Sequence, residues 1–373
     1  MDKTPLSALD RQGFHSTHYW HKLEDGRVQC DLCPRFCKLH EGQRGLCFVR
    51  INDAQQIKLT TWGRSSGFVI DPIEKKPLNH FLPGSSVFSF GTAGCNLACK
   101  FCQNWDISKS RQMDTLMDRA LPEEIAETAL NYGAQSVAFT YNDPVIFHEY
   151  AIDVAAACHA VGLKTVAVTA GYVCPAPRAE FYQFIDAANV DLKAFSEQFY
   201  FRLTGSHLAN VLDTLHYIYH QTDTWLELTT LLIPGENDSD AEIAAMCDWV
   251  FSELGPEVPM HFTVFHPDWK MRDKPVTPHQ TVQRARQIAL ERGIRYAYVG
   301  NVHDKPASST YCHQCGALLI GRDVYDLSEW GLDAHGGCRL CGAPCAGVFK
   351  IQPGHWGNRR LPVSIDRPGS LWT

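Results

Sequence analysis

Hydrophobic and polar positions alternate regularly through the middle of the chain. Short apolar runs, many of them rich in β-branched residues, are separated by longer stretches with helical periodicity. Apolar runs of this kind are typical of strands that are buried on both faces of a sheet. The pattern predicts strands at Val87–Gly91, Ser136–Tyr141, Lys164–Thr169, Asn189–Ala194, Thr224–Ile233, Met260–Phe265 and Arg295–Val299.

The stretches between these runs carry helix signals. One of them repeats an apolar residue at every fourth position and so forms a single stripe, at Ile146, Tyr150, Val154 and Cys158. Ser239–Glu242 and Thr277–Gln280 match capping boxes, the second with proline at the first helical position. Alternating strands and helices predict a parallel α/β sheet or barrel over residues 85–302.

Cysteines divide the rest of the chain into two further segments. Residues 1–84 contain Cys30, Cys33, Cys37 and Cys47, the N-terminal quartet. Residues 306–373 contain Cys312, Cys315, Cys338 and Cys341, the C-terminal quartet, and a tail rich in proline and glycine. We therefore expect a cysteine-rich metal-binding segment, a central α/β domain and a C-terminal zinc-ribbon-like segment.

Composition narrows the class of protein. A hydrophobic content of 45% and a charged content of 20% are ordinary for a soluble globular chain. The net charge of −7 gives the whole chain no basic field for nucleic acid. No apolar run approaches a membrane span, and residues 1–21 lack the pattern of a signal peptide. Fifteen cysteines in tight groups then indicate metal or cluster ligands in a reducing cytoplasm.

The most informative run is Cys95-Asn-Leu-Ala-Cys99-Lys-Phe-Cys102. Three thiolates can hold three irons of a four-iron cluster and leave the fourth iron without a protein ligand. Closed clusters and structural zinc sites normally take four ligands. The run therefore predicts an iron kept open for a small molecule; the alternative is a zinc loop that takes its fourth ligand from elsewhere.

The same run resembles the signature of the radical SAM superfamily. The resemblance implies that S-adenosylmethionine (SAM) binds the open iron of a [4Fe-4S] cluster through its amino and carboxylate groups. It also implies that the reduced cluster cleaves SAM to methionine and a 5′-deoxyadenosyl radical. Phe101, the aromatic residue before the last cysteine, belongs to the expected cofactor contacts.

Other chemical residues fall where a β/α barrel gathers its active site, at the carboxyl ends of strands. A protein carboxylate should contact the SAM ammonium, and a protein cation should contact the SAM carboxylate. Asp143 and Asp191 are candidates for the first role and Lys193 for the second. Asp191 and Lys193 lie two positions apart on a strand and so share a face; the alternative is an ion pair that plugs the barrel mouth.

Asp191-Leu192-Lys193 also resembles a motif of the pyruvate formate-lyase-activating enzymes, in which the aspartate and lysine contact SAM. Those enzymes usually carry Gly-Gly-Glu-Pro after the second strand, where this chain has Tyr141-Asn142-Asp143-Pro144. Either the backbone or the side chain at this turn could then contact the SAM ammonium. A histidine after the sixth strand binds the SAM carboxylate in that family; His261 matches best, and His266 is the alternative.

Several longer stretches resemble the radical SAM component of the AmmeMemoRadiSam system, a relative of the activating enzymes. They are Cys30–Cys37, Asp71–Pro77, Gly94–Asn104, Phe265–Met271, Gly300–Val302 and the C-terminal Cys-x2-Cys-Gly pairs. The resemblance implies a partial β/α barrel of about six parallel strands. It also implies a reductant such as flavodoxin or ferredoxin, and companion proteins of AMMECR and Memo type.

The two quartets predict two further metal sites. Two Cys-x2-Cys-Gly knuckles in the C-terminal quartet are typical of a zinc ribbon, and a rubredoxin-like iron site is the alternative. The N-terminal quartet, spaced x2, x3 and x9, satisfies either zinc or an auxiliary iron–sulfur cluster, and the spacing does not decide between them.

These features favour an enzyme that abstracts hydrogen from a macromolecule, most simply a protein. The cofactor carries the chemistry, so no catalytic side chain is assigned. The alternative is a non-catalytic, zinc-dependent module that binds protein or nucleic acid. The net charge of −7 weighs against nucleic acid, and the Asp191/Lys193 pair weighs against the module as a whole.

Overall fold

A mostly parallel sheet forms the centre of the protein. The computed structural model describes residues 9–10, 13–109 and 118–365. Within them the strands of the main sheet follow the order β15-β14-β13-β12-β11-β10-β8-β7-β19, and β9 also pairs with β7. Their bounds are β7 Arg64–Pro72, β8 Ser86–Gly91, β9 Asp118–Arg119, β10 Ser136–Phe139, β11 Lys164–Thr169, β12 Ala187–Asp191, β13 Trp225–Leu232, β14 Met260–Val264, β15 Ala297–Gly300 and β19 Leu361–Pro362.

Strands β8 and β10 to β15 are the ones that the hydrophobic pattern predicts. All pairs among them are parallel, and each predicted strand is present with its ends moved by three residues or fewer. Antiparallel β7 and β19, which the pattern did not predict, extend one edge. The other edge is β15, so the sheet is open between β15 and β19.

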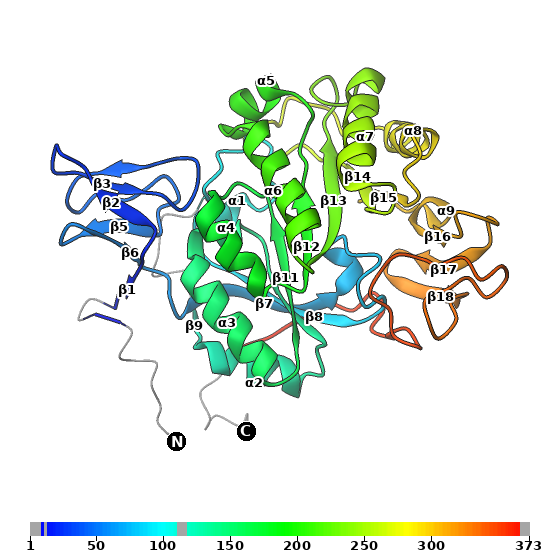
Figure 1. Ribbon diagram of the computed structural model, residues 1–373, viewed down its shortest axis with the longest axis horizontal. Coiled ribbons are helices and arrows are strands. Elements are labelled where there is room, and N and C mark those ends of the chain that lie inside the picture. The colour runs from blue at the N-terminus through cyan, green and yellow to red at the C-terminus, as the bar shows by residue number, and fades with distance from the viewer. Residues whose placement is uncertain (1–8, 11–12, 110–117, 366–373) are drawn as a thin grey trace.

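Helices cover one face of this sheet (Figure 1). Their bounds are α1 Trp105–Ser108, α2 Pro122–Asn131, α3 His148–Ala160, α4 Pro175–Phe181, α5 Glu197–Phe199, α6 Leu208–Gln221, α7 Asp240–Leu254, α8 His279–Glu291 and α9 Lys305–Ser308, with short turns η2 Ile73–Lys75, η3 Pro144–Phe147, η4 Tyr182–Phe184 and η5 Tyr200–Thr204. The predicted apolar stripe is confirmed, because its four residues are all buried: Ile146 in η3, and Tyr150, Val154 and Cys158 in α3.

The two predicted helix starts have different outcomes. Ser239 caps α7 as expected, since its hydroxyl accepts a hydrogen bond from the N–H of Glu242. The start predicted at Thr277 is wrong. Helix α8 begins at His279 with Pro278 before it. The Thr277 hydroxyl accepts from the N–H of Phe265 instead, and it donates to the carbonyl of Leu232 in β13.

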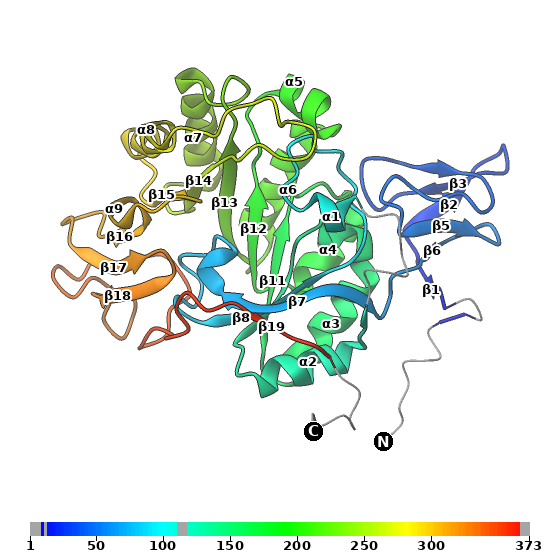
Figure 2. The same ribbon diagram turned by 180° about the vertical axis from the view of Figure 1, so that it is seen from behind.

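Residues 73–82 cover the inner face, meaning the face of the main sheet that is turned away from the helices (Figure 2). Ile73, Leu78 and Phe81 pack there in one buried cluster with residues near the strand starts, Val87, Ala138, Val166 and Ala187. Burial of this apolar surface holds the segment against the sheet. Residues 64–82, which we assigned to the N-terminal segment, therefore pack with the central domain through β7 and η2.

The cysteine-rich segments lie at opposite ends of the molecule (Figures 1 and 2). The N-terminal one has two antiparallel sheets, with β1 His15–Ser16, β5 Arg50–Asp53 and β6 Gln56–Leu59 in one and β2 Trp20–Lys22, β3 Val28–Cys30 and β4 Lys38–Leu39 in the other. The C-terminal one has a single antiparallel sheet of β16 Thr310–Tyr311, β17 Leu318–Asp323 and β18 Asp326–Trp330. Among the described helices, none has the length and hydropathy to cross a membrane.

Candidate functional site

The three-cysteine loop, residues 92–104, leaves the carboxyl end of β8 and carries Cys95, Cys99 and Cys102. Its entry depends on Gly94, which has a φ of +86°. A Cβ at Gly94 would overlap the carbonyl oxygen of Cys47 in the N-terminal segment. Only glycine combines this conformation with so close a backbone approach. The loop is therefore built in direct contact with the N-terminal segment.

Asn142 fixes the start of the same loop. Its Nδ2 donates to the carbonyl of Gly94 at 2.8 Å, and its Oδ1 accepts from the N–H of Thr92 at 3.2 Å. Further along, the N–H groups of Ala98 and Lys100 donate to carbonyls of η5, at 2.8 and 2.9 Å. Hydrogen bonds to the loop backbone from two sides thus hold the cysteine-bearing turn in place.

The segment after β14 covers the end of the loop. The N–H of Lys270 donates to the carbonyl of Lys100 at 3.0 Å. Trp105 and Trp269 stack with ring centroids 5.1 Å apart, and Trp105 Nε1 donates to Asp268 Oδ1 at 2.9 Å. These contacts hold the segment after β14 against the end of the three-cysteine loop.

Asp191 and Lys193 form an ion pair beside Cys99. Lys193 Nζ lies 2.7 Å from Asp191 Oδ2. Burial disfavours the ammonium, but Asp191 and Cys99 outweigh it and raise the pKa of Lys193. Burial raises the pKa of the Cys99 thiol to about 12, and Lys193 opposes that shift by favouring the thiolate. The structure thus brings the predicted cation to the predicted cluster ligand.

Asp143 presents its backbone rather than its carboxylate to the three-cysteine loop. The carboxylate accepts hydrogen bonds from the N–H of Val145 at 3.1 Å, the Thr169 hydroxyl at 3.0 Å and the N–H of Ala170 at 3.0 Å. Burial raises the pKa of the Asp143 carboxyl, although these three hydrogen bonds favour its charged form. Its own N–H points to the Cys95 sulfur. The carboxylate is therefore occupied in capping η3.

His261 and Asp191 lie at the same register position in the main sheet. Thr229 of β13 pairs in register with both residues, so His261 lies two strands from Asp191 on the same row. Adjacent strands are about 4.8 Å apart, which puts the two Cα atoms about 10 Å apart. His261 Nε2 lies 2.7 Å from a carboxylate oxygen of buried Glu227.

Phe101 is buried against Phe199, with ring centroids 5.7 Å apart.

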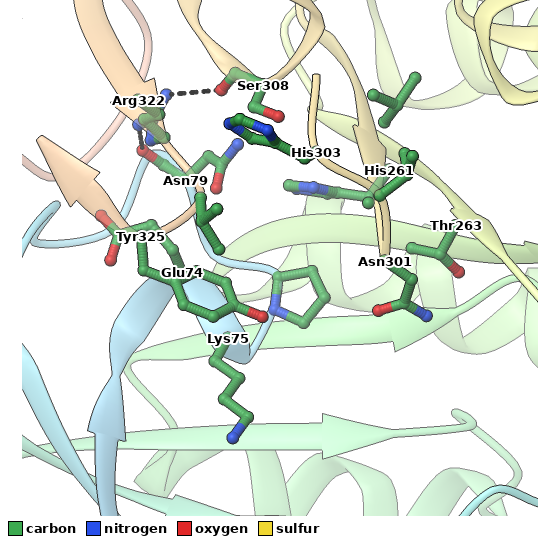
Figure 3. A pocket seen from close by; sticks show the side chains of 15 residues that line it. Glu74, Lys75, Asn79, His261, Thr263, Asn301, His303, Ser308, Arg322 and Tyr325 are labelled. Carbon is green, nitrogen blue, oxygen red and sulfur yellow. Dashed lines mark hydrogen bonds between the residues drawn. The ribbon is translucent and has the colours of Figure 1, made fainter. Parts of the chain in front are cut away.

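A cavity of about 360 Å³ opens between the β15 edge, η2 and the C-terminal segment. His261 and Thr263 line it from β14, Glu74 lines it from η2, and Tyr325 lines it from the C-terminal segment (Figure 3). Arg322 forms one wall, where its guanidinium donates to the carbonyls of Asn79 and Ser308 (Figure 3). The cavity therefore lies where the main sheet is open.

The C-terminal quartet has the geometry of a site for a single metal ion. Sγ of Cys312 lies 3.6 Å from that of Cys341, and Sγ of Cys315 lies 3.7 Å from that of Cys338. Four thiolates at 2.3 Å from a tetrahedral zinc are about 3.8 Å apart. The N–H groups of Cys315 and Gln314 overcome the effect of burial and lower the pKa of the Cys312 thiol to about 7.

The other cysteines are spaced differently. Among the described residues, the C-terminal quartet is the one group in which three or more Cys, His or carboxylate ligand atoms all lie within 4.8 Å of one another. Cys95, Cys99 and Cys102 still face one another closely enough that their charges interact. Thiolates around a cluster stand further apart than around one ion, because irons and sulfides separate them. The three-cysteine loop therefore fits an iron–sulfur cluster.

Comparison with known proteins agrees with this arrangement. The family model described as the radical SAM superfamily matches residues 90–247, which include the three-cysteine loop and Asp191/Lys193. The chain is also 37% identical over 325 residues to the uncharacterized protein MJ0808 of Methanocaldococcus jannaschii, covering 87% of this chain and 96% of that protein. The chain belongs to the radical SAM superfamily.

Within the radical SAM superfamily the chain is similar to activating enzymes. It is 23% identical over 224 residues to the 4-hydroxyphenylacetate decarboxylase activating enzyme of Clostridioides difficile, covering 55% of this chain and 70% of that enzyme. Among solved structures, a radical SAM methyltransferase from Sphaerobacter thermophilus is similar at a TM-score of 0.48 and 14% identity, covering 82% of this chain and 81% of that structure.

Two residues of this radical SAM site were missed from the sequence. Asn142 was passed over in favour of its acidic neighbour, because its partners Thr92 and Gly94 lie about fifty residues earlier in the chain. Arg35, inside the N-terminal quartet, donates from Nε to the carbonyl of Asn96 at 2.8 Å. No local pattern could have found that contact, because its partner lies in a different cysteine loop.

Proposed function

We propose that Cys95, Cys99 and Cys102 hold a [4Fe-4S] cluster whose fourth iron takes SAM. The observation that carries the proposal is the Lys193 ammonium beside Cys99, paired with Asp191 at 2.7 Å. A cation and a carboxylate next to the cluster ligands complement the two charged groups of the SAM amino acid moiety. The similarity to activating enzymes supports the same assignment.

When bound, the reduced cluster would supply the electron that cleaves SAM to methionine and a 5′-deoxyadenosyl radical. The protein's part is to orient SAM and to exclude water. Lys193 holds the SAM carboxylate and Asp191 holds its ammonium, with backbone groups near Asp143 as further partners for the ammonium. His261, on the same row as Asp191, is a second partner for the carboxylate. Buried Phe101 stiffens the ligand loop.

Lys193→Met tests the proposed SAM contact. A charge-assisted hydrogen bond contributes about 1.5–3 kcal/mol, so we expect the variant to bind SAM about 10- to 100-fold more weakly. Its iron content should stay that of the wild type, because Lys193 is not a ligand. Equilibrium dialysis of labelled SAM against anaerobically reconstituted protein measures the affinity.

Lys164→Met is the matched control. Lys164 also pairs with a strand-end aspartate, Asp186 at 2.6 Å, but its side chain is 52% exposed. Exposed pairs contribute little, so this variant should bind SAM as the wild type does. Unchanged SAM affinity in Lys193→Met would remove Lys193 from the site.

We further propose that the substrate is a macromolecule, most simply a protein. The similarity to an activating enzyme supports this. The cavity at the open edge of the sheet lies between the central domain and the C-terminal segment. Zinc in the C-terminal quartet would hold that wall of the cavity in place. From the sequence resemblance to the AmmeMemoRadiSam component we also propose a flavodoxin- or ferredoxin-type reductant and companions of AMMECR and Memo type. The grouped cysteines support a reducing cytoplasm as the setting.

Deuterium transfer identifies the substrate class. Cells of the source organism are grown in deuterated medium, and the lysate is separated by size into macromolecules and small molecules. Each fraction is incubated with the reduced enzyme and unlabelled SAM. We expect deuterium in 5′-deoxyadenosine from the macromolecular fraction, lost after protease but not after nuclease treatment. Deuterium from the small-molecule fraction alone would contradict a protein substrate.

A further inference from the structure

The N-terminal quartet surrounds one cavity. Cys30 ends β3, Cys33 and Cys37 lie in the turn to β4, and Cys47 lies in the loop before β5. All four line the same small cavity, whose other walls are mostly aliphatic, from Leu32, Leu39, Leu46 and Ile146. Thiols gathered in an apolar, water-poor cavity need a metal group to compensate their charge when they ionise. The quartet is therefore a metal site and not a set of unrelated buried thiols.

The spacing of the four sulfurs decides the kind of metal group. In the C-terminal quartet of the same chain the sulfur atoms pair at 3.6 and 3.7 Å, as one tetrahedral ion requires. No three sulfurs of the N-terminal quartet meet even the looser limit of 4.8 Å, although every one of them is described. Four thiolates that share a cavity but stand apart fit the corners of a cubane cluster.

Gly45 lies against that cavity. A Cβ at Gly45 would be in ordinary van der Waals contact, at 3.7 Å, with the sulfurs of both Cys37 and Cys47. These two sulfurs therefore flank the same point of the cavity wall. The buried guanidinium of Arg50 also lines the cavity, held by Glu149 at 2.5 and 3.1 Å. A cation fixed at this wall stabilises the negative charge of four thiolates around a cluster.

We propose that Cys30, Cys33, Cys37 and Cys47 bind a second [4Fe-4S] cluster with a protein thiolate on every iron. Full ligation leaves no iron for SAM or substrate, which separates this site from the three-cysteine loop. The two loops are nevertheless in contact, because Arg35 donates to the carbonyl of Asn96 at 2.8 Å and Gly94 packs on the Cys47 carbonyl. Cys47 and Cys95 also line a common pocket.

Metal counting in a variant without the first cluster tests the proposal. Cys95, Cys99 and Cys102 are all changed to alanine, and wild type and variant are reconstituted anaerobically with iron and sulfide and then desalted. We expect about eight irons and eight sulfides per wild-type chain, and about four of each in the variant. Zinc should be about one per chain in both. The variant keeps the whole N-terminal quartet, so a folding defect in that quartet cannot decide the result.

Each other outcome overturns the proposal. No iron and about two zincs in the variant would make the N-terminal quartet a zinc site. About one iron without sulfide would make it a mononuclear iron site. A second variant, Cys33→Ser with Cys37→Ser, should lower the iron of the otherwise wild-type chain from about eight to about four. The control is Cys158→Ser, a buried cysteine in α3 that should leave the count unchanged.

Electron paramagnetic resonance gives a readout that does not depend on SAM cleavage. Dithionite supplies one electron to each [4Fe-4S] cluster. The triple-alanine variant should therefore show the signal of one reduced cluster, and added SAM should not change it, because no iron is open. A signal that shifts when SAM is added would contradict full ligation by the N-terminal quartet. These results stand even if the wild type fails to cleave SAM.

Discussion

Cys99→Ala is expected to abolish SAM cleavage. Cys99 is buried beside Lys193 and is the middle ligand of the three-cysteine loop. Two remaining thiolates cannot hold a four-iron cluster with one open iron. The chain should lose about four irons, and 5′-deoxyadenosine formation should fall about a thousandfold or more, a loss of at least 4 kcal/mol of barrier lowering. Iron and sulfide analysis with chromatographic assay of 5′-deoxyadenosine measures both effects.

Cys247→Ala separates ligand loss from loss of a buried sulfur. Cys247 is fully buried in α7 and lies outside the three cysteine groups. Its substitution removes the same sulfur atom from an apolar environment, so the packing cost is similar. We expect its iron content and its rate of SAM cleavage to match the wild type. If Cys99→Ala kept both as Cys247→Ala does, the three-cysteine loop would not be the SAM cluster site.

Gly94→Ala should disrupt the same site without removing a ligand. The new Cβ would overlap the carbonyl of Cys47, a backbone group that cannot turn away. The positive φ of 86° adds about 1–2 kcal/mol for a residue with a Cβ. Displacement of the loop start should weaken the hydrogen bond from Asn142 and lower iron retention. We expect SAM cleavage to fall more than tenfold, measured with iron content after desalting.

Gly162→Ala is the control that isolates the cost of placing a Cβ on a left-handed backbone conformation. Gly162 has a φ of +80° between α3 and β11, but a Cβ there would meet no atom within 4 Å. This variant should lose some stability to the left-handed conformation and keep its iron and activity. Equal losses of iron in the two variants would mean that strain, and not the contact with Cys47, explains the effect of Gly94→Ala.

The parallel part of the fold and the main cysteine groups could be predicted because their signals are local. Strands β8 and β10 to β15 are short, mostly apolar runs, and each cysteine group is a short motif with its own spacing. Asp191 and Lys193 were expected to share one face of a strand, but β12 ends at Asp191. The two side chains form an ion pair at 2.7 Å, which is the alternative that the sequence left open.

The antiparallel edge of the sheet could not be predicted in this way. Strand β19 has two residues, too few for a periodic pattern, and it pairs with β7 across almost the whole chain. Strand β7 itself includes Gly67 and two serines, which weaken a strand signal. The domain boundary expected near residue 84 rested on the same omission, since β7 was not recognised as part of the main sheet.

Contacts between distant loops were also beyond the sequence. Asn142 and Arg35 both hold the three-cysteine loop, but each reaches a backbone carbonyl whose position depends on the whole fold. The sequence could name Asp143 as an acid near SAM, yet it could not show that three donors already occupy the carboxylate. The spacing of the N-terminal quartet likewise left zinc and a cluster open, because sequence separation does not give sulfur positions.

The central claim is that this radical SAM protein cleaves SAM reductively at the three-cysteine loop. The most direct measurement is the yield of 5′-deoxyadenosine and methionine from anaerobically reconstituted wild-type protein with SAM, with and without dithionite. The account predicts equal amounts of the two products, formed only with dithionite. Loss of SAM without 5′-deoxyadenosine, or no reaction at full iron loading, would contradict it and favour a metal-dependent binding module.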